Sequence, residues 1–143
     1  MSTVAQILKS KPERAVHSVT PDTSVLDALK LMAAKNVGGL VVLEGARIAG
    51  LVTERDYARK VALLDRSSKD TPVREIMTAK VIYVGPERTS EECMALMTEN
   101  RIRHLPVLEG GKLIGLVSIG DLVKDVISEQ KFLIEQLRQY VAG

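Results

Sequence analysis

The sequence predicts an α+β (α/β-like) fold made of two βαββα repeats packed as a pseudo-two-fold pair. Three observations lead to this prediction: the chain repeats itself, each copy alternates short apolar runs with helix-forming segments, and one copy alone would leave a sheet face uncovered. The chain has 143 residues and is 45% hydrophobic, which is enough for a core shared by two halves.

The internal repeat is visible without a gap. Residues 16–57 align with residues 81–122 at a constant shift of 65 positions, and a shorter echo relates residues 4–8 to residues 73–77. The expected organisation is repeat 1 over residues 1–64, a linker over 65–72, repeat 2 over 73–127 and a C-terminal helix over 128–143.

The first strand and helix of each repeat have recognisable start and stop signals. Short apolar runs at residues 16–19 and 81–84 predict strands that end before Pro21 and Pro86. Capping-box spacing then predicts where the first helices begin, in two pairs: Ser24 with Asp27, and Thr89 with Glu92.

The second half of each repeat is predicted to be a β-hairpin followed by a helix. Two apolar runs flank a two-residue turn that contains glycine, at residues 44–47 and again at 109–112. The second helices are expected from about Thr53 to Leu64, and from about Ser118 onward.

After each hairpin the chain reads glycine, two apolar residues, a hydroxyl residue, two variable residues and aspartate, at residues 50–56 and 115–121. A strand ends and a helix begins at the hydroxyl residue, and unpaired N–H groups at a helix start suit a phosphate. A carboxylate one turn later can accept both hydroxyls of a ribose. The same spacing is also a capping box with aspartate in place of glutamate, and one residue can serve both roles.

Taken together, these residues resemble a pair of CBS domains, the tandem unit called a Bateman module. The matching features are residues 73–78, the proline after the first strand, residues 103–107 and both Gly-x-x-Thr/Ser-x-x-Asp motifs. The resemblance covers residues 4–127 and is closest to stand-alone CBS-pair proteins. It implies a regulatory module, not an enzyme, that binds AMP, ADP, ATP, NAD or S-adenosylmethionine in clefts between the repeats and modulates a partner protein.

The resemblance also implies roles for individual residues. The aspartates would hold the ribose, the hydroxyl residues would approach the phosphate, and the start of the second strand would complete each pocket. Arginines near the motif favour a phosphorylated ligand such as AMP over S-adenosylmethionine, whose sulfonium gains nothing from them. No catalytic or metal-ligating residue is expected, and the expected nucleotide-binding residues are Val37, Gly38, Gly39, Thr53, Arg55, Asp56, Ile102, Arg103, His104, Ser118 and Asp121.

Composition argues against other classes of partner. The net charge of +2 and an aromatic content of 3% are too low to favour nucleic acid. No apolar run reaches the ~18 to 20 residues of a membrane span. The single cysteine, Cys93, excludes an internal disulfide, and no signal peptide is visible, so we expect a cytoplasmic protein.

Several alternatives stay open at this point. One is an interaction scaffold with vestigial pockets, and another is an enzyme that acts on the nucleotide. In the C-terminal helix an apolar stripe at helical spacing either packs back on its own module or forms the contact of a homodimer, the oligomer that we expect; the stripe comprises Leu133, Ile134, Leu137 and Val141.

Overall fold

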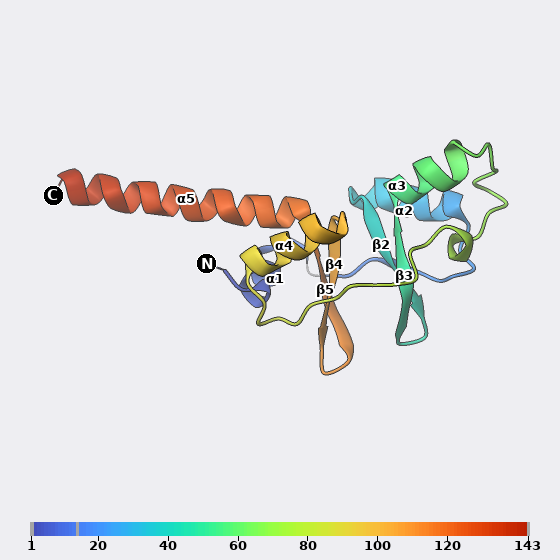
Figure 1. Cartoon of the computed structure of the whole chain (residues 1–143), viewed down its shortest axis with the longest axis horizontal. Coiled ribbons are helices and arrows are strands. Elements are labelled where there is room, and N and C mark those ends of the chain that lie inside the picture. Colours follow the sequence, from blue (N-terminus) through green and yellow to red (C-terminus); the bar gives the residue numbers. More distant parts are fainter. Residues whose placement is uncertain (1, 14, 143) are drawn as a thin grey trace. The chain divides into compact units, whose positions relative to one another are not determined.

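The computed structural model describes residues 2–13 and 15–142, which form two compact units (Figure 1). The central unit comprises residues 16–82, whereas the terminal unit joins residues 1–15 to residues 83–143. Residues 2–13, expected as part of repeat 1, therefore fold with most of repeat 2, and residues 73–82, expected as part of repeat 2, fold with most of repeat 1. The mixture of helices and strands agrees with the predicted α+β class.

The central unit is built on a three-stranded sheet in the order β1-β2-β3. Strand β1 (Ser18–Val19) runs parallel to β2 (Gly39–Glu44), and β2 pairs with β3 (Arg47–Thr53) as the predicted hairpin. Its turn contains Gly45 at φ +64°, a left-handed conformation that glycine adopts without a steric cost.

Helix α2 (Val25–Lys35) begins where the capping spacing predicts, because the Ser24 hydroxyl accepts a hydrogen bond from the Asp27 N–H at 3.1 Å. Its buried face packs on the sheet. The apolar core of the central unit consists of Val19, Val25, Ala28, Met32, Leu40, Val42, Ala49, Val52, Val61, Val73 and Ile76.

The second helix of repeat 1 differs from the uninterrupted helix expected to Leu64. Helix α3 (Glu54–Tyr57) is only four residues long and widens into a π-helical segment, η1 (Ala58–Ala62). The Leu63 N–H bonds to the Ala58 carbonyl at 3.0 Å, a five-residue step, and Val61 within the wide turn is buried in the core.

The chain that follows stays on the central unit. The Val25 N–H donates to the Thr71 carbonyl at 2.8 Å, so residues 65–72, expected as a linker, pack at the start of α2. A 3₁₀ turn, η2 (Val73–Glu75), comes next, and Thr78 then exchanges two backbone hydrogen bonds with Leu51 of β3, at 2.8 and 3.0 Å.

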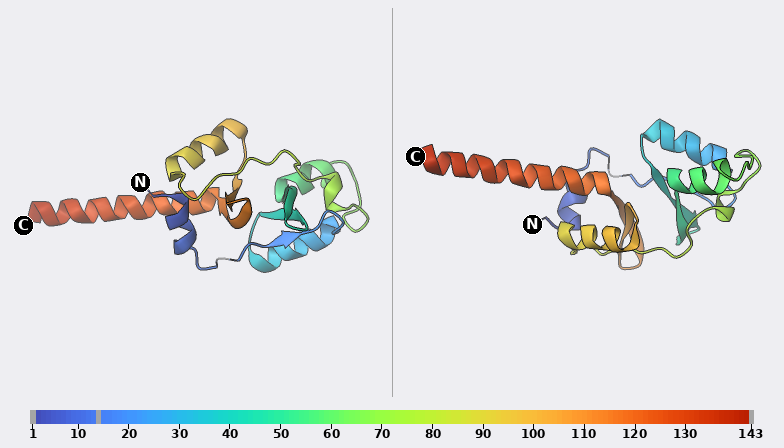
Figure 2. Two further views of the ribbon diagram at one scale, coloured as in Figure 1. Left: turned by 90° about the horizontal axis from the view of Figure 1, so that it is seen from below. Right: turned by 45° about the horizontal axis from the view of Figure 1, so that its top comes forward.

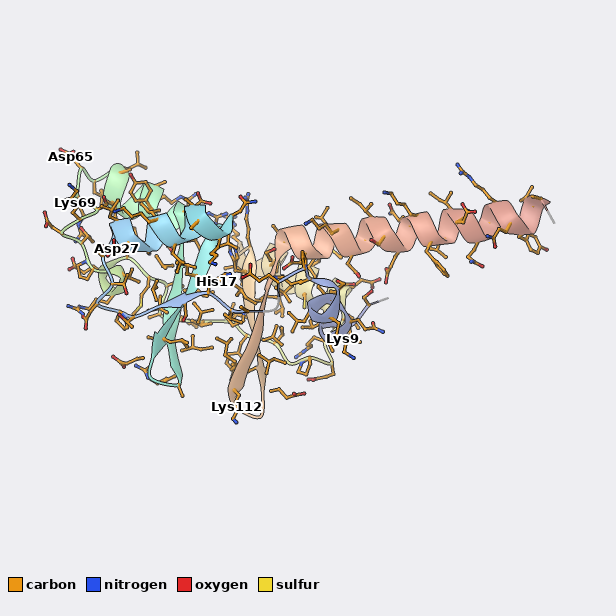
Figure 3. The ribbon with its side chains drawn as sticks, turned by 180° about the vertical axis from the view of Figure 1, so that it is seen from behind. Lys9, His17, Asp27, Asp65, Lys69 and Lys112 are labelled. Atoms are coloured by element: carbon orange, nitrogen blue, oxygen red, sulfur yellow. The ribbon has the colours of Figure 1, made fainter. Side chains whose placement is uncertain are left out.

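The terminal unit repeats this plan with different partners. Strands β4 (His104–Glu109) and β5 (Lys112–Ser118) form the second predicted hairpin, and Lys112 stands at its tip (Figure 3). Helix α4 (Ser90–Asn100) is capped by Thr89, which forms a reciprocal capping box with Glu92 as predicted. Helix α1 (Val4–Ser10) is joined to the segment before α4 by a 2.7 Å hydrogen bond from the Val4 N–H to the Arg88 carbonyl.

The first strands are shorter than the apolar runs predicted. Only Ser18 and Val19 of the first run pair with β2, and in repeat 2 a single bridge joins Val84 to Val107. Pro106 stands where repeat 1 has Val41. Because a proline has no N–H to donate to the first strand, the pairing in repeat 2 is reduced to one bridge.

Helix α5 (Ile119–Ala142) is one continuous helix of 24 residues that includes the C-terminal helix expected over residues 128–143, apart from residue 143, which lies outside the described residues. Its first turns contact α1, α4 and β5, and Leu122 is fully buried. Every residue from Lys131 to Ala142 is exposed, and this half of the helix extends beyond the rest of its unit (Figure 2). Among the described residues, no helix is long and apolar enough to cross a membrane.

Candidate functional site

The first half-site, assembled entirely within the central unit, consists of residues 37–39, Thr53, Arg55 and Asp56. Gly39 pairs with Thr53 across the hairpin, and the Glu54 N–H donates to the Gly38 carbonyl at 3.1 Å. The start of β2 and the end of β3 therefore lie side by side, which brings Gly38 and Gly39 beside Thr53. Val37 directly precedes the two glycines along the chain, and Arg55 and Asp56 follow Thr53.

The Asp56 side chain folds back on the start of α3. Its Oδ2 accepts hydrogen bonds from the Thr53 N–H at 3.0 Å and the Thr53 hydroxyl at 3.1 Å, while Thr53 Oγ1 accepts from the Asp56 N–H at 3.2 Å. Lys60 Nζ lies 3.3 Å from the other oxygen, Oδ1. Asp56 is 8% exposed, so this capping carboxylate is nearly buried and both of its oxygens are engaged.

The second half-site, assembled within the terminal unit, has the same backbone arrangement. His104 pairs with Ser118 across the hairpin, and the Ile119 N–H donates to the Arg103 carbonyl at 2.9 Å. Arg103 is exposed and His104 is half-buried. Arg103 and His104 thus lie beside Ser118 as Gly38 and Gly39 lie beside Thr53, and Ile102 directly precedes them, with its N–H bonded to the Met97 carbonyl at 3.0 Å.

Asp121 also caps its helix but keeps one oxygen available. Its Oδ2 accepts from the Ser118 N–H at 2.9 Å, and the Ser118 hydroxyl accepts from the Asp121 N–H at 3.2 Å. Lys11 Nζ donates to the same Oδ2 at 2.9 Å and to the Leu116 carbonyl at 2.8 Å. Oδ1 of Asp121 takes no hydrogen bond from any residue that the structure describes.

The two lysines were missed by the motif analysis. Lys60 follows Asp56 by four residues, a helical spacing at which opposite charges meet, so the sequence contained a signal for it. The equivalent position in repeat 2 is Asp125, whose Oδ2 is buried and takes no hydrogen bond among the described residues. There the lysine comes instead from the segment after α1, which no spacing within repeat 2 could have predicted.

A further acidic group distinguishes the first half-site. The carboxylate of Glu54 covers Gly38: an added Cβ at this glycine would lie 3.0 Å from Glu54 Oε1. Repeat 2 has Ile119 at the position of Glu54, and Arg103 at the position of Gly38. The half-sites are therefore alike in backbone and unlike in charge.

The part of the chain that the structure describes contains no cluster of metal-ligating side chains. Across residues 2–13 and 15–142, no group of three or more histidine, cysteine, aspartate or glutamate side chains is placed to hold a metal ion. His17, the histidine outside the half-sites, precedes β1 in an extended stretch (Figure 3).

Known proteins share this architecture. The mitochondrial CBS domain-containing protein CBSX3 of Arabidopsis thaliana is 45% identical to this chain, in an alignment that covers 99% of the chain and 73% of that protein. A protein with CBS domains from Burkholderia ambifaria has a solved structure with a TM-score of 0.88 and 66% identity, covering 90% of this chain and 96% of that one.

Two more distant structures have descriptions that name a ligand or an assembly. The CBS domain pair of protein MJ0100, solved in complex with 5-methylthioadenosine and S-adenosyl-L-methionine, shares the fold at 22% identity and a TM-score of 0.77, over 90% of this chain and 98% of that one. A hexameric CBS-CP12 protein from bloom-forming cyanobacteria is 32% identical with a TM-score of 0.75, over 86% of this chain and 70% of that one.

The family model for the CBS domain matches the chain twice, over residues 4–63 and residues 73–128. These two segments contain both hairpins and both aspartate motifs described above. The chain therefore belongs to the CBS domain family and carries two CBS domains in tandem.

Proposed function

We propose that this chain is a regulatory, nucleotide-sensing module that binds an adenine nucleotide at its two aspartate half-sites and modulates a partner protein. The observation that carries the proposal is the duplicated local geometry: in each repeat an aspartate and a hydroxyl residue stand at a strand-to-helix junction beside the start of the preceding strand. A helix cap alone does not require the matching strand start in both repeats.

The chemistry of Asp121 supports ribose recognition in the second half-site. A ribose diol offers two hydroxyl donors. The contacts of Asp121 given above engage Oδ2, and Oδ1, which takes no hydrogen bond from any described residue, can accept one from the ligand. Asp56 has both oxygens engaged, so a ribose there would have to displace Lys60. The second half-site is therefore the stronger proposed site.

Charge supports a phosphorylated ligand at the same half-site. Arg103 and His104 adjoin Ser118, whereas in the first half-site Glu54 lies over Gly38 and would repel a phosphate. AMP is the proposed regulatory ligand, with ADP, ATP and NAD as related candidates. The MJ0100 pair binds adenosine compounds without phosphate, and the exposed arginines of this chain are the reason to propose a phosphorylated one.

Calorimetric titration of the full chain with AMP, ADP, ATP, NADH and S-adenosylmethionine tests the proposal. We expect saturable binding of at least one phosphorylated ligand and weaker binding of S-adenosylmethionine. A bound ligand at 100 times its dissociation constant adds about 2.7 kcal/mol to the free energy of unfolding, so a thermal shift must accompany it. Flat titrations with all five ligands would contradict the proposal.

One observation favours a second candidate, an interaction scaffold with vestigial pockets. Both aspartates already cap helices and already meet a lysine, so neither requires a ligand for its charge. The same titrations separate the candidates. Incubation with AMP or ATP followed by chromatography tests the third candidate, an enzyme, and we expect the nucleotide to be recovered unchanged.

We also propose that the chain is a homodimer in the cytoplasm. The exposed apolar stripe of α5 supports self-association. Light scattering at tens of micromolar should give twice the mass of one chain. Cell fractionation tests the compartment; recovery in mitochondria would contradict it, and the named Arabidopsis relative is mitochondrial.

A further inference from the structure

The outer part of α5 carries an apolar stripe that its own unit leaves exposed. Leu137 is 63% exposed and Val141 83%, and a shallow groove along the helix is lined by Ile134, Leu137, Arg138, Val141 and Ala142. Side chains stand out around this half of the helix with no other segment of the terminal unit beside them (Figure 3). Large apolar side chains at such exposure mark a surface for association.

The stripe repeats every seven residues. We define the stripe as the six positions of this pattern along the whole of α5, at alternating steps of four and three residues: Val123, Ile127, Gln130, Ile134, Leu137 and Val141. Leu133, part of the stripe expected from the sequence, lies at its edge. The six positions have the a/d pattern of a coiled coil, with Ile127, Ile134 and Val141 at position a. In parallel coiled coils, β-branched residues at position a and leucine at position d favour two strands. Here all three a positions are β-branched, and Leu137 is at position d.

We infer that α5 pairs with α5 of a second copy of this chain as a parallel, in-register, two-stranded coiled coil. This inference rests on the homodimer proposed above and names the surface that forms it. The surface that covers the stripe is thus the same stripe of a second copy of the chain. Two further features indicate that the two helices run parallel.

The first feature is a row of positive charge along one edge of the stripe. Lys124, Lys131 and Arg138 follow one another at seven-residue steps, at position e, and all three are exposed. In an antiparallel pair the e positions of the two helices face each other, so the two basic rows would repel. In a parallel pair position e faces position g of the partner helix, which here holds Val126, Leu133 and Tyr140, and the alkyl stems of the basic residues can cover them.

The second feature is Gln130, the one polar residue among the six a/d positions. In a parallel in-register pair it lies opposite the same residue of the partner, and two glutamine amides can hydrogen-bond to each other. In an antiparallel pair centred on the stripe it would lie opposite an isoleucine and lose its hydrogen bonds to water. A single buried polar pair is a known means of fixing register.

Cysteine cross-linking of the full chain tests the direction. In a Cys93→Ala background, which copies the Ala28 of repeat 1, Gln130→Cys and Leu137→Cys are made separately, with Gln139→Cys on the opposite face of α5 as the matched control. Under oxidised glutathione we expect covalent dimers of both stripe variants to form at least about tenfold faster than those of the control. Only in parallel, in-register helices does each of the two positions lie opposite the same position of the partner helix. Cross-linking at one of the two stripe positions alone would indicate antiparallel pairing and overturn the inference.

Light scattering of Leu137→Glu and its control Gln139→Glu separates this inference from the homodimer proposal. We expect the first variant to be a monomer and the second to remain a dimer. If both variants stay dimeric and neither stripe cysteine cross-links, the dimer uses another surface and only the inference fails. If the unmodified chain has the mass of one protomer, the homodimer proposal and the inference both fail.

Discussion

Lys11 and Asp121 form an ion pair of 2.9 Å that joins the segment after α1 to the start of α5, 110 residues later in the chain. The same ammonium also donates to the Leu116 carbonyl at 2.8 Å. Lys11, from the beginning of the chain, therefore completes the surroundings of Asp121 in the second half-site, which lies in the terminal unit. In the central unit Lys60, from the helix itself, takes the corresponding place beside Asp56.

Replacing Lys11 should lower stability. Lys11→Met keeps most of the side-chain stem and removes both hydrogen bonds, and because the pair is partly exposed we expect a loss of about 1–2 kcal/mol in the free energy of unfolding. Lys112→Met, at the exposed tip of the β4–β5 hairpin, is the matched control and should change stability little. Urea denaturation measures both; equal midpoints for the two variants would show that the ion pair contributes nothing.

Two glycines at equivalent positions should respond differently to alanine. A Cβ on Gly50 would lie 2.7 Å from the Thr78 carbonyl oxygen, whereas a Cβ on Gly115 would lie 2.7 Å from the terminal carbons of the Leu8 side chain. Backbone cannot move aside as a leucine side chain can, so Gly50→Ala should cost about 1–3 kcal/mol and Gly115→Ala clearly less. Thermal unfolding of both variants measures the difference, and the reverse order would contradict the packing described for β3.

The Thr89–Glu92 capping box should make stability depend on acid pH. The hydrogen bond from Arg88 and those from Thr89 lower the pKa of Glu92 below its ordinary value of 4.5. The carboxylate therefore adds stability that is fully present above the ordinary pKa and is lost as the pH falls through the lowered one. Urea midpoints of Glu92→Gln and the unmodified chain should differ at pH 7 and converge at about pH 2; a gap that is constant with pH would rule out this role for the charge.

Cys93 should be an unreactive thiol in the folded chain. It is fully buried, and burial raises its pKa above the ordinary 9.0. Alkylation should therefore wait for unfolding and run roughly 10³-fold or more slower than in urea-unfolded protein. Because the folded pKa is raised, the contribution of Cys93 to stability should be constant below about pH 9 and decline above it, so the difference in stability between Cys93→Ala and the unmodified chain should change with pH only above about pH 9. Rapid labelling of the native chain at pH 8 would contradict the burial.

The features that sequence predicted well are those that depend on neighbouring residues. The hairpins follow from apolar runs around two-residue turns, and the helix starts follow from Thr89 with Glu92 and Ser24 with Asp27, because a cap is formed within one helical turn. The junction geometry of Asp56 and Asp121 was predictable for the same reason.

The features that sequence missed depend on distant packing. Nothing in residues 1–15 indicates that they fold with repeat 2, and therefore Lys11 could not be assigned to Asp121. The reduced first strand of repeat 2 is different, because Pro106 itself forbids the missing hydrogen bond and the sequence contained that information.

The measurement that tests the central claim most directly is nucleotide affinity in Asp121→Asn and Asp56→Asn, alone and combined. If Asp121 binds ribose as an ion, its replacement weakens charge-assisted hydrogen bonds worth roughly 1.5–3 kcal/mol each, so AMP affinity should fall by about tenfold or more. Affinity is measured at a temperature at which the free variant, which also loses the ion pair with Lys11, stays folded. Asp56→Asn should have an equal or smaller effect, because Lys60 and Thr53 already engage that carboxylate. Unchanged affinity in both single variants and in the double variant would show that the two motifs only cap helices, and would contradict the sensor proposed here.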